Sequence, residues 1–451
     1  MSTALVILAA GKGTRMNSDL PKVLHQIAHA PLLVHAMRAA SALAPERHIV
    51  VAGHGADLVE AAARAYDETA EVVLQTEQLG TGHAVLQAKE ALGDFAGDVI
   101  VLYGDTPLIR PETLEAMIAA RATCDVVVLG FDAADPGRYG RLVMSGDRLD
   151  RIVEFKDATE QERAITLCNS GVICASRETL FDLLDHVGND NAAGEYYLTD
   201  IIGLARDHGL SATAVTCDEA ETLGVNSRVE LAAAEAAFQA RRRQSALEDG
   251  ITMPAPETVH FAYDTIVGRD CVIEQNVVFG PDVTIESGAH IRAFCHLEGC
   301  HVSQRAIVGP YARLRPGAEL AEDVRVGNFC EIKNAQIEAG AKVNHLSYIG
   351  DATVGARANI GAGTITCNYD GVFKHHTEIG RDAFIGSNTM LVAPVTIGHE
   401  AMTASGSVVT MDVPDGALAL GRAKQVNKAG LAVKLFDMLK SKKKKQRKDT
   451  N

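Results

Sequence analysis

The clearest pattern in the sequence is a six-residue repeat of apolar positions between residues 379 and 405. An α-helix turns every ~3.6 residues and would scatter these positions around its axis, so the repeat does not predict a helix. It predicts a parallel β-helix, in which each hexapeptide forms one flat side of a triangular coil and points one apolar residue inward. Two rows keep this spacing: Ile379, Ile385, Leu391 and Ile397, and Ala383, Thr389, Val395 and Ala401.

The same rhythm begins near Asp264 and runs through much of the second half of the chain. It is looser over residues 294–307, returns in pieces between 349 and 360, and is broken by an inserted segment at 366–378. Insertions in repeat proteins often carry the binding face, so this segment is a candidate for ligand contact. The early rows are Cys271, Val277, Val283 and Ala289, and Ile273, Phe279, Ile285 and Ile291.

The first half of the chain alternates short apolar runs with alanine-rich segments. The pattern predicts strands at 5–8, 48–51, 72–75 and 99–102, and helices at 57–66 and 80–90. This order is typical of an α/β fold with a parallel sheet. A glycine-containing loop at 9–16 follows the first strand, as in nucleotide-binding folds, although it is neither a Walker A motif nor a complete dinucleotide fingerprint.

Charge and small residues in this loop favour an anionic ligand. The small side chains let backbone amides approach an anion, while Lys12, Arg15 and Lys22 supply positive charge. Asp105 follows the strand expected at 99–102, at the end of a parallel strand where ligands bind. Spacing alone leaves two interpretations of Asp105 open, a Mg²⁺ ligand or an aspartate that caps a turn.

One alanine-rich segment joins the two halves. Residues 229–243 contain no glycine or proline and predict a single helix that acts as a rigid spacer. The segment ends in Arg241, Arg242 and Arg243, which we expect to be a solvated helix end rather than a binding patch. We therefore expect an α/β domain at 1–223, a linker helix at 224–244, and a β-helix with a basic tail at 245–451.

Composition narrows the function classes. A chain of 451 residues favours two or more domains, and a net charge of −15 argues against nucleic-acid binding. The basic cluster at 440–448 is expected to be a solvated, disordered tail rather than one attracted to anions or membranes. The nine cysteines form no C-x-x-C pair, which argues against a zinc site or disulfide framework and suits a reducing cytosol.

No segment predicts export or membrane insertion. The apolar run at 4–10 is short, lacks a basic leader and meets the glycine loop at once, so it predicts a buried strand rather than a signal peptide. No apolar run approaches the ~20 residues of a membrane span. These patterns predict a cytoplasmic protein with no nucleic-acid partner and no stable membrane association.

The motifs of the first half resemble those of sugar-1-phosphate nucleotidyltransferases. Residues 8–16 and 21–24 are similar to that family's signature, and residues 75–84 resemble the uridylyltransferases that act on N-acetylglucosamine 1-phosphate. The resemblance implies a Rossmann-like domain that uses UTP and Mg²⁺ and releases pyrophosphate. Five shorter motifs follow in the family's order, at 103–105, 139–141, 152–154, 169–171 and 224–226.

This resemblance implies a role for each matching residue. Arg15 and Lys22 would face the phosphates, and Asp105 and Asn226 would bind Mg²⁺. The acetamido sugar would contact Gly140, Glu154 and Asn169. The uridine nucleotide would be held by Leu8, Ala9, Ala10, Gly11, Lys22, Gln75, Gly80 and Thr81, with Tyr103 and Gly104 beside them.

The motifs of the second half resemble the left-handed parallel β-helix acetyltransferases that are joined to such a uridylyltransferase in one bifunctional family. The motifs are residues 314–320, 326–329, 361–371 and 391–395, and the resemblance runs from about residue 3 to about Arg422. It implies the left hand of the β-helix and a homotrimer whose acetyl-transfer sites are built from neighbouring chains. The substrates implied are glucosamine 1-phosphate, acetyl-CoA and UTP, and the products are UDP-N-acetylglucosamine and pyrophosphate.

On spacing alone His345 would be a surface histidine, but the resemblance makes it the general base. An ammonium must lose a proton before it attacks a thioester, and histidines can accept that proton near neutral pH. The sugar phosphate would be held by Arg315, Lys333, Tyr348 and Asn359. The acetyl-CoA site would be lined by Ala362, Asn368, Tyr369, Ser387, Ser405 and Arg422, although Ser405 replaces the family's usual alanine.

Two other functions stay open at this point. One is a single-function sugar-1-phosphate nucleotidyltransferase whose β-helix only assembles or regulates it. The other is a non-catalytic sensor of sugar nucleotides with an interaction scaffold. His345 with the 368–369 motif argues against the first, and intact Arg15, Lys22, Asp105 and Asn226 argue against the second.

Overall fold

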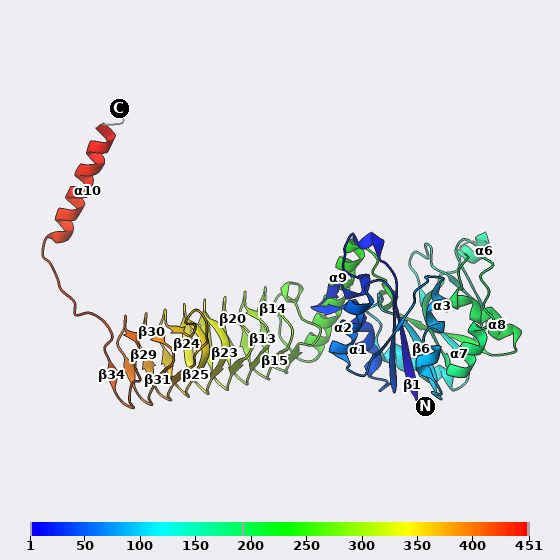
Figure 1. Cartoon of the computed structure of the whole chain (residues 1–451), viewed down its shortest axis with the longest axis horizontal. Coiled ribbons are helices and arrows are strands. Elements are labelled where there is room, and N and C mark those ends of the chain that lie inside the picture. The colour runs from blue at the N-terminus through cyan, green and yellow to red at the C-terminus, as the bar shows by residue number, and fades with distance from the viewer. Residues whose placement is uncertain (1, 192–193, 449–451) are drawn as a thin grey trace. The chain divides into compact units, whose positions relative to one another are not determined.

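The computed structural model describes residues 2–191 and 194–448, with side chains as far as 446 (Figure 1). Its chain divides into two compact units, residues 1–267 with 275–283 and residues 268–274 with 284–451. None of the helices in the described part of the chain has the length and hydrophobicity that a membrane crossing requires.

The first unit is an α/β domain. Its strands are β1 (Thr3–Ala9), β2 (Gln26–Ile27), β3 (Ala30–Pro31), β4 (Arg47–Ala52), β5 (Glu71–Leu74), β6 (Asp98–Tyr103), β7 (Val126–Asp132), β8 (Arg141–Ser145), β9 (Arg148–Val153), β10 (Leu167–Ser176) and β11 (Ala212–Cys217). Its α-helices are α1 (Leu32–Ser41), α2 (Ala56–Tyr66), α3 (Thr81–Leu86), α4 (Lys89–Leu92), α5 (Pro111–Arg121), α6 (Glu160–Arg163), α7 (Arg177–Leu184), α8 (Ile201–Asp207) and α9 (Arg228–Glu248). Short 3₁₀ helices are η1 (Thr14–Met16), η2 (Lys22–Leu24), η3 (Leu198–Asp200), η4 (Glu219–Thr222) and η5 (Pro256–Thr258).

The main sheet has the order β11-β7-β10-β6-β1-β4-β5, with β1 parallel to both β4 and β6. Every residue of β1 is buried, because the sheet is covered on both faces. Alternate side chains of β1 enter different cores, Leu5 and Ile7 against α1, α2 and α5, and Val6 and Leu8 against α3, α7 and α8. The four predicted strands are confirmed, and the helix expected at 80–90 is split into α3 and α4.

Helix α9 is the helix predicted at 229–243, and it continues to Glu248. It packs on the first unit, where Ala234 and Phe238 are buried against Met16 and Leu32. The expectation of a solvated arginine end was wrong. Arg241 and Arg242 are only partly exposed, and each donates a hydrogen bond to a backbone carbonyl, because the helix extends beyond them and its flank lies against the domain.

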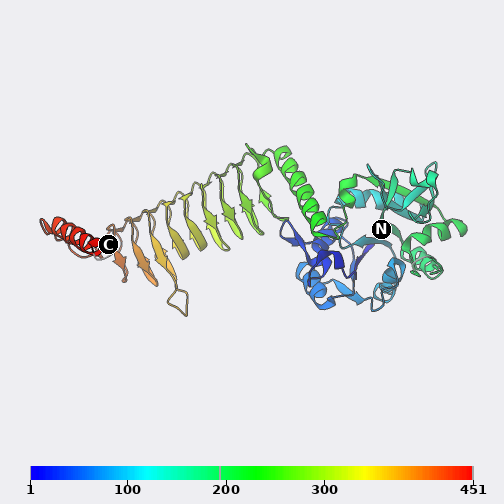
Figure 2. The same ribbon diagram turned by 90° about the horizontal axis from the view of Figure 1, so that it is seen from above.

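The repeat region forms a parallel β-helix (Figure 2). Its strands are β12 (Ile266–Val267), β13 (Val272–Ile273), β14 (Val278–Phe279), β15 (Val283–Ile285), β16 (His290–Ile291), β17 (His296–Leu297), β18 (Cys300–Val302), β19 (Ile307–Val308), β20 (Arg313–Leu314), β21 (Ala318–Leu320), β22 (Arg325–Asn328), β23 (Glu331–Ile337), β24 (Lys342–His345), β25 (Tyr348–Val354), β26 (Asn359–Ile360), β27 (Ile365–Cys367), β28 (Thr377–Ile379), β29 (Phe384–Ile385), β30 (Met390–Val392), β31 (Val395–Ile397), β32 (Met402–Thr403), β33 (Val408–Val409) and β34 (Leu418–Ala419).

Three rows of strands make the three faces of the second unit. One face is β13-β16-β19-β22-β24-β26-β29-β32-β34. The other two are joined in one sheet by the long strands β23 and β25, which continue from one face to the next. These rows run through β18-β21-β23-β25-β28-β31 and through β17-β20-β23-β25-β27-β30-β33.

The predicted hexapeptide rows are confirmed as the core of this β-helix. Both rows between 379 and 401 are buried, so each side of the coil points two residues inward, two positions apart, and not the single residue expected. The second row fits because its members are small or β-branched, such as Ala383, Thr389 and Val395. Thr389 keeps its hydroxyl bonded, to the Gly386 carbonyl at 2.6 Å.

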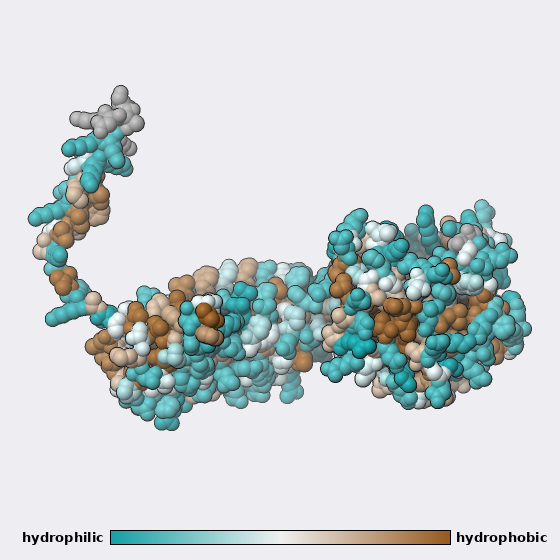
Figure 3. Space-filling view, in the orientation of Figure 1, coloured by the Kyte–Doolittle hydropathy of each residue, from teal (hydrophilic) through white to brown (hydrophobic). Residues whose placement is uncertain are grey.

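The basic segment at 440–448 lies in helix α10 (Leu431–Lys448). Its described side chains are exposed, as expected, but the expectation of disorder was wrong, because leucine, lysine and methionine are strong helix formers and no glycine or proline interrupts them. Figure 3 shows hydrophobic residues along the first part of this helix. The side chains of Arg447 and Lys448, and residues 449–451 of the predicted tail, lie outside the described residues.

Candidate functional site

The first candidate site is a cavity of about 310 Å³ at the carboxyl ends of β1 and β6. The two strands run parallel with Leu8 opposite Tyr103, so the loops that follow them meet at one edge of the sheet. Gly104 lies behind the cavity wall and donates its N–H to the Leu8 carbonyl at 3.0 Å. The predicted residues that line the cavity are Leu8, Ala9, Ala10, Gly11, Lys22, Gln75, Gly80, Thr81, Tyr103 and Asp105.

The segment from Gln75 to Thr81 forms one rim of this cavity. Gln75 is buried and its Nε2 donates to the Gly80 carbonyl at 3.2 Å, which fixes the amide in place. Gly80 has a φ of 107°, and a Cβ there would lie 2.6 Å from the Tyr196 carbonyl oxygen. Only glycine fits, so the predicted loop depends on a contact with a segment more than a hundred residues away.

Three distant residues converge beside the cavity. The Lys22 ammonium forms an ion pair with Asp105 and donates to Asn226 Oδ1 at 2.9 Å. Val225 N–H donates to the Asp105 carbonyl at 2.9 Å, which holds the 225–226 segment against the strand end. The carboxylate of Asp105 and the amide oxygen of Asn226 therefore face the same point, which the Lys22 ammonium occupies.

These two oxygens fit Mg²⁺, which prefers hard oxygen ligands and takes only one or two from the protein when phosphates and water supply the rest. In the described part of the chain, no group of three or more histidine, cysteine, aspartate or glutamate side chains could hold a metal ion. The donor set therefore suits a metal shared with a phosphorylated substrate rather than an all-protein metal site.

Gly140, Glu154 and Asn169 lie together. Asn169 N–H donates to the Gly140 carbonyl at 2.8 Å, and a Cβ on Gly140 would lie 3.4 Å from Glu154 Oε1. Burial raises the pKa of Glu154, and nearby Asp200 adds to the effect. Tyr103 lies near both this group and the cavity. Burial raises the pKa of its phenol, and the charges of Asp105 in the cavity and of Glu154 in this group raise it further.

The structure does not bring every predicted residue to the cavity. Arg15 lies on η1, is exposed and is not part of the lining. The sequence reasoning missed Val23, Gln78, Ala84 and Glu195, which do line it. Gln78, whose Nε2 donates to the Ala10 carbonyl at 3.0 Å, lies inside the recognised 75–84 motif and could have been found there. Nothing in the sequence pointed to Glu195.

The second candidate site surrounds His345, the last residue of β24. His345 is exposed and stands in register with Asn328 on β22. The imidazole Nδ1 lies 3.0 Å from Asn328 Oδ1. An amide oxygen can only accept a hydrogen bond, so Nδ1 carries the proton and Nε2 keeps the lone pair of a base. Asn328 was quoted only as part of a motif and was not predicted as a site residue.

A group of cations lies on the adjoining face. Arg315 and Lys333 follow paired positions of β20 and β23, so they occupy the same place in successive coils. Lys374 of the inserted segment contacts Lys333, and this contact lowers the pKa of Lys333, with burial as the next cause. Arg315 also pairs with Glu331 at 2.9 Å. These three cations have one direct carboxylate partner between them, so their excess positive charge can bind an anion.

Tyr348 and Asn359 complete the predicted sugar-phosphate group. Tyr348 is in register with Glu331, and its ring covers Gly350, where a Cβ would overlap the tyrosine hydroxyl. Gly350 pairs with Lys333, so the phenol lies beside the cation group. Asn359 lies one coil beyond His345 on the same face, paired with Lys342.

The predicted coenzyme residues fall into two groups. Ala362, Ser387 and Ser405 stack at one corner, since Asn388 N–H donates to the Ala362 carbonyl and Gly406 N–H to the Ser387 carbonyl. This corner continues from His345, whose carbonyl accepts from Gly363 N–H at 3.2 Å. All three predicted corner residues therefore lie beyond the histidine along one line.

The inserted segment holds Asn368 and Tyr369. Asn368 is buried and donates to Asp351, which anchors the segment, whereas Tyr369 is exposed. Asp370 accepts hydrogen bonds from His375 and two backbone amides, which lower its pKa to about 2. Arg422 follows the last strand and is exposed, and the preceding Gly421 donates its N–H to Ser407 Oγ at 3.2 Å, two residues from Ser405. Lys374 was not predicted.

Profiles of two known families match the chain. The profile of the MobA-like NTP transferase domain matches residues 5–192. The profile of the bacterial transferase hexapeptide (six repeats) matches residues 264–299 and 376–410. The two matches fall on the α/β domain and on the β-helix, as their folds require.

Curated relatives match the chain over nearly its full length. The bifunctional protein GlmU of Ruegeria sp. (strain TM1040) is 70% identical over 443 residues, which cover 98% of this chain and 99% of the relative. The bifunctional protein GlmU of Ruegeria pomeroyi is 69% identical over 450 residues, which cover 100% of this chain and 100% of the relative. Among solved structures, UDP-glucose pyrophosphorylase complexed with UDP-glucose has a TM-score of 0.45 and 20% identity, covering 54% of this chain and 100% of its own.

Proposed function

This chain belongs to the family of the bifunctional protein GlmU, and we propose that its two candidate sites carry out the family's two reactions. The chain is an N-acetylglucosamine-1-phosphate uridylyltransferase and a glucosamine-1-phosphate N-acetyltransferase of UDP-N-acetylglucosamine synthesis. The observation that carries the assignment of sites is His345 on one face of the β-helix with the cations Arg315, Lys333 and Lys374 on the adjoining face. A β-helix that served only for assembly would have no use for that combination.

Uridylyl transfer is assigned to the cavity beside β1 and β6. An oxygen of N-acetylglucosamine 1-phosphate attacks the α-phosphorus of UTP, a new P–O bond forms, and the bond to pyrophosphate breaks. Both reactants are anions. Lys22 in the cavity lowers their repulsion, the resemblance assigns the same role to Arg15, and the backbone of the glycine loop holds the nucleotide phosphates. Asp105 and Asn226 would hold Mg²⁺, which supplies further positive charge to the phosphates when bound.

Acetyl transfer is assigned to the surroundings of His345. The Nε2 of His345 takes a proton from the ammonium of glucosamine 1-phosphate, and the free amine attacks the thioester carbonyl of acetyl-CoA. The carbon–nitrogen bond of an amide forms as the carbon–sulfur bond breaks, and the departing thiolate of coenzyme A takes up the proton that the attacking nitrogen loses. Arg315, Lys333, Tyr348 and Asn359 would hold the sugar phosphate, and Ala362, Asn368, Tyr369, Ser387 and Ser405 would line the coenzyme.

A homotrimer is supported by an apolar corner of the β-helix. Phe294, Tyr311 and Phe329 stack along it with ring centroids 4.8 and 5.4 Å apart, and Leu346 comes next. These four side chains are 46–62% exposed. A contiguous apolar surface of this kind is unfavourable in water and is typical of a contact between proteins. Leu346 adjoins His345 and Phe329 adjoins Asn328, so a second copy packed on this corner would border the acetyl-transfer site.

Phe329→Asp should break the trimer and cut acetyl transfer by about tenfold or more, because a charge would be buried in the contact between copies. Uridylyl transfer should stay within about twofold of the unchanged protein, since its site lies within one chain. Sedimentation and the two activities, measured on the same sample, test this. Leu58→Asp, which changes an exposed leucine of α2, should alter neither. A monomeric Phe329→Asp protein with full acetyl transfer would contradict the assembly.

Analysis of products tests the whole assignment. With glucosamine 1-phosphate, acetyl-CoA, UTP and Mg²⁺, we expect UDP-N-acetylglucosamine, coenzyme A and pyrophosphate in equal amounts. Leaving out acetyl-CoA should stop product formation from glucosamine 1-phosphate but not from N-acetylglucosamine 1-phosphate. Pyrophosphate without acetylation would support the single-function nucleotidyltransferase, and no pyrophosphate at all would support the non-catalytic sensor.

We also propose that the enzyme works in the cytosol. In the part of the chain that the structure describes no cysteine is in a disulfide, and six cysteines are buried, which suits a reducing compartment where thiols persist. The three substrates, UTP, acetyl-CoA and a sugar phosphate, are charged metabolites of that compartment.

A further inference from the structure

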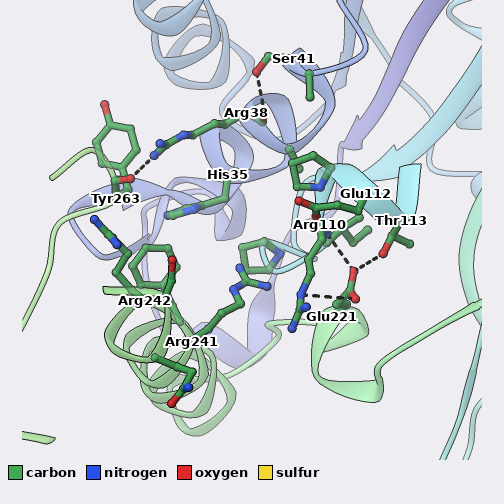
Figure 4. Close-up of a pocket in the computed structure, with 18 of the residues that line it drawn as sticks. His35, Arg38, Ser41, Arg110, Glu112, Thr113, Glu221, Arg241, Arg242 and Tyr263 are labelled. Carbon is green, nitrogen blue, oxygen red and sulfur yellow. Dashed lines mark hydrogen bonds and ion pairs between the residues drawn. The ribbon is translucent and has the colours of Figure 1, made fainter. Parts of the chain in front are cut away.

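A second, much larger cavity lies in the first unit, between α1, α5 and α9. Its volume is about 1310 Å³, against about 310 Å³ for the nucleotide cavity, and the two cavities share no lining residue. Figure 4 shows its side chains, with Arg38 and Arg242 beside Tyr263 and with Arg110 beside Glu221. Neither reaction described above uses this space.

Three arginines of the cavity lack a carboxylate partner. Within the described residues, Arg38, Arg241 and Arg242 have no carboxylate oxygen within 4 Å. Each makes one hydrogen bond to a backbone carbonyl, Arg38 to Tyr263, Arg241 to Leu108 at 2.8 Å and Arg242 to Thr265 at 3.0 Å. A guanidinium has five N–H donors, so most of the donors of each are left for another acceptor.

Among the described residues, no acid contacts these three groups directly, although the charges of Glu221 and Glu112 act on Arg241 and that of Asp249 acts on Arg242. Glu221 is buried and accepts from Arg110 N–H at 2.9 Å and from the Thr113 hydroxyl at 2.7 Å. It also pairs with the Arg110 guanidinium at 3.6 Å, so its charge is already used. Glu112 and Glu248 also line the cavity but are exposed to solvent.

Two of the arginines are partly shielded from water, and each lies near another arginine of the cavity. Burial lowers the pKa of Arg241, and the Arg110 charge lowers it further. Burial also lowers the pKa of Arg242, the charge of Asp249 offsets part of this effect, and the smaller effect of the Arg38 charge acts with burial. Each pair thus places like charges in one cavity without a carboxylate in direct contact with Arg241 or Arg242, and an anionic ligand would relieve that repulsion.

The remaining lining suits the organic part of such a ligand. Phe238 and Tyr263 present rings, and Pro107, Ile109 and Val215 present apolar surface. Arg38 lies over the Tyr263 ring with its guanidinium carbon 5.2 Å from the centroid, which keeps that arginine turned toward the cavity side of the ring. A volume above the usual ~300–1,000 Å³ of ligand pockets admits a molecule of metabolite size.

We propose that this cavity binds an organic phosphate carrying at least two negative charges, with Arg38, Arg241 and Arg242 as its anion-binding groups. Guanidinium groups match phosphate oxygens in pairs, and two or more charges are needed to satisfy arginines contributed by both α1 and α9. The proposal concerns a site separate from both reactions, and it holds whichever substrates those reactions use.

Calorimetric titration of the full-length protein tests the proposal. Lys22→Ala is introduced into every sample, so that the anion-binding lysine of the nucleotide cavity is absent. The probes are inorganic pyrophosphate, ADP and fructose 1,6-bisphosphate, which separate a bare anion, a nucleotide and a sugar bisphosphate. We expect one of the two organic probes to bind at one molecule per chain and more tightly than pyrophosphate.

Two variants and one matched control locate the binding. Arg38→Ala and Arg242→Ala should each weaken it by about ten- to a hundredfold, the loss expected for one charge-assisted contact. Arg38 is exposed, so Arg38→Ala should leave the protein folded. This variant therefore still tests the proposal if Arg242→Ala fails to fold. Arg243→Ala removes the same charge from the next position of α9, outside the cavity, and should change affinity less than about twofold. Absence of binding by both organic probes, or equal binding by all variants, would overturn the proposal.

Discussion

Asp105→Ala should reduce uridylyl transfer by about a hundred- to a thousandfold, the loss expected when a group that stabilises developing charge is removed. Asp105 supplies one of the two oxygens that converge beside the nucleotide cavity, and its carboxylate pairs with Lys22. Without it, Asn226 alone would hold the proposed metal, and Lys22 would lose the partner that fixes its ammonium. Acetyl transfer should stay within about twofold, because His345 belongs to the other unit.

The measurement is pyrophosphate release from UTP and N-acetylglucosamine 1-phosphate, with coenzyme A release from the other site on the same preparation. Asp105→Asn keeps the shape of the side chain and should lose most of the same activity, because a neutral amide attracts the cation less. Asp132→Ala is the matched control, since Asp132 also ends a strand, β7, but does not line the cavity. Loss of both activities in a folded protein would refute the assignment to separate sites.

His345→Ala should reduce acetyl transfer by about a hundred- to ten-thousandfold and leave uridylyl transfer intact, because a positioned general base contributes about that much. The reason is geometric. Asn328 accepts the Nδ1 proton at 3.0 Å and so leaves Nε2 free to take a proton from the substrate ammonium. His296→Ala is the matched control, an exposed histidine elsewhere on the β-helix.

Asn328 separates positioning from chemistry in the same experiment. Asn328→Ala should lower kcat by about tenfold with little change in KM, because the imidazole loses the acceptor that selects its tautomer. Asn328→Asp keeps an acceptor in the same place and should restore most of kcat. A His345→Ala protein that acetylates at the unchanged rate would contradict the role of the base, as would equal losses in the two Asn328 variants.

Some local patterns were sufficient for correct predictions. The hexapeptide rows were predicted because stacking repeats a burial requirement at a fixed interval, and Ile379 and Ile385 are buried as that interval requires. The strand at residues 5–8 was predicted because a sheet covered on both faces requires an unbroken apolar run. The second inward row per coil side was not anticipated, since threonine and alanine in a repeat do not by themselves indicate burial.

Other predictions failed where packing between distant segments decided the outcome. Arg241 and Arg242 looked like a charged helix end, yet α9 lies against the first unit and turns them toward a cavity. The role of Arg15 at the phosphates, which rests on the resemblance, stays a prediction, since its side chain is exposed on η1 and does not line the cavity. Local charge alone cannot distinguish a solvated arginine from one that lines a cavity.

By itself, the sequence determined the two kinds of fold, the glycine loop, the coil rows and most residues that line the first cavity, because each depends on a short stretch of chain or on a recognisable motif. Only the tertiary structure decided which side chains meet. Lys22 reaches Asp105 and Asn226 across 83 and 204 residues, and Arg38 shares a cavity with Arg241 and Arg242 on another helix. Such contacts are made by the packing of whole elements, and the spacing of residues along one element carries no record of them.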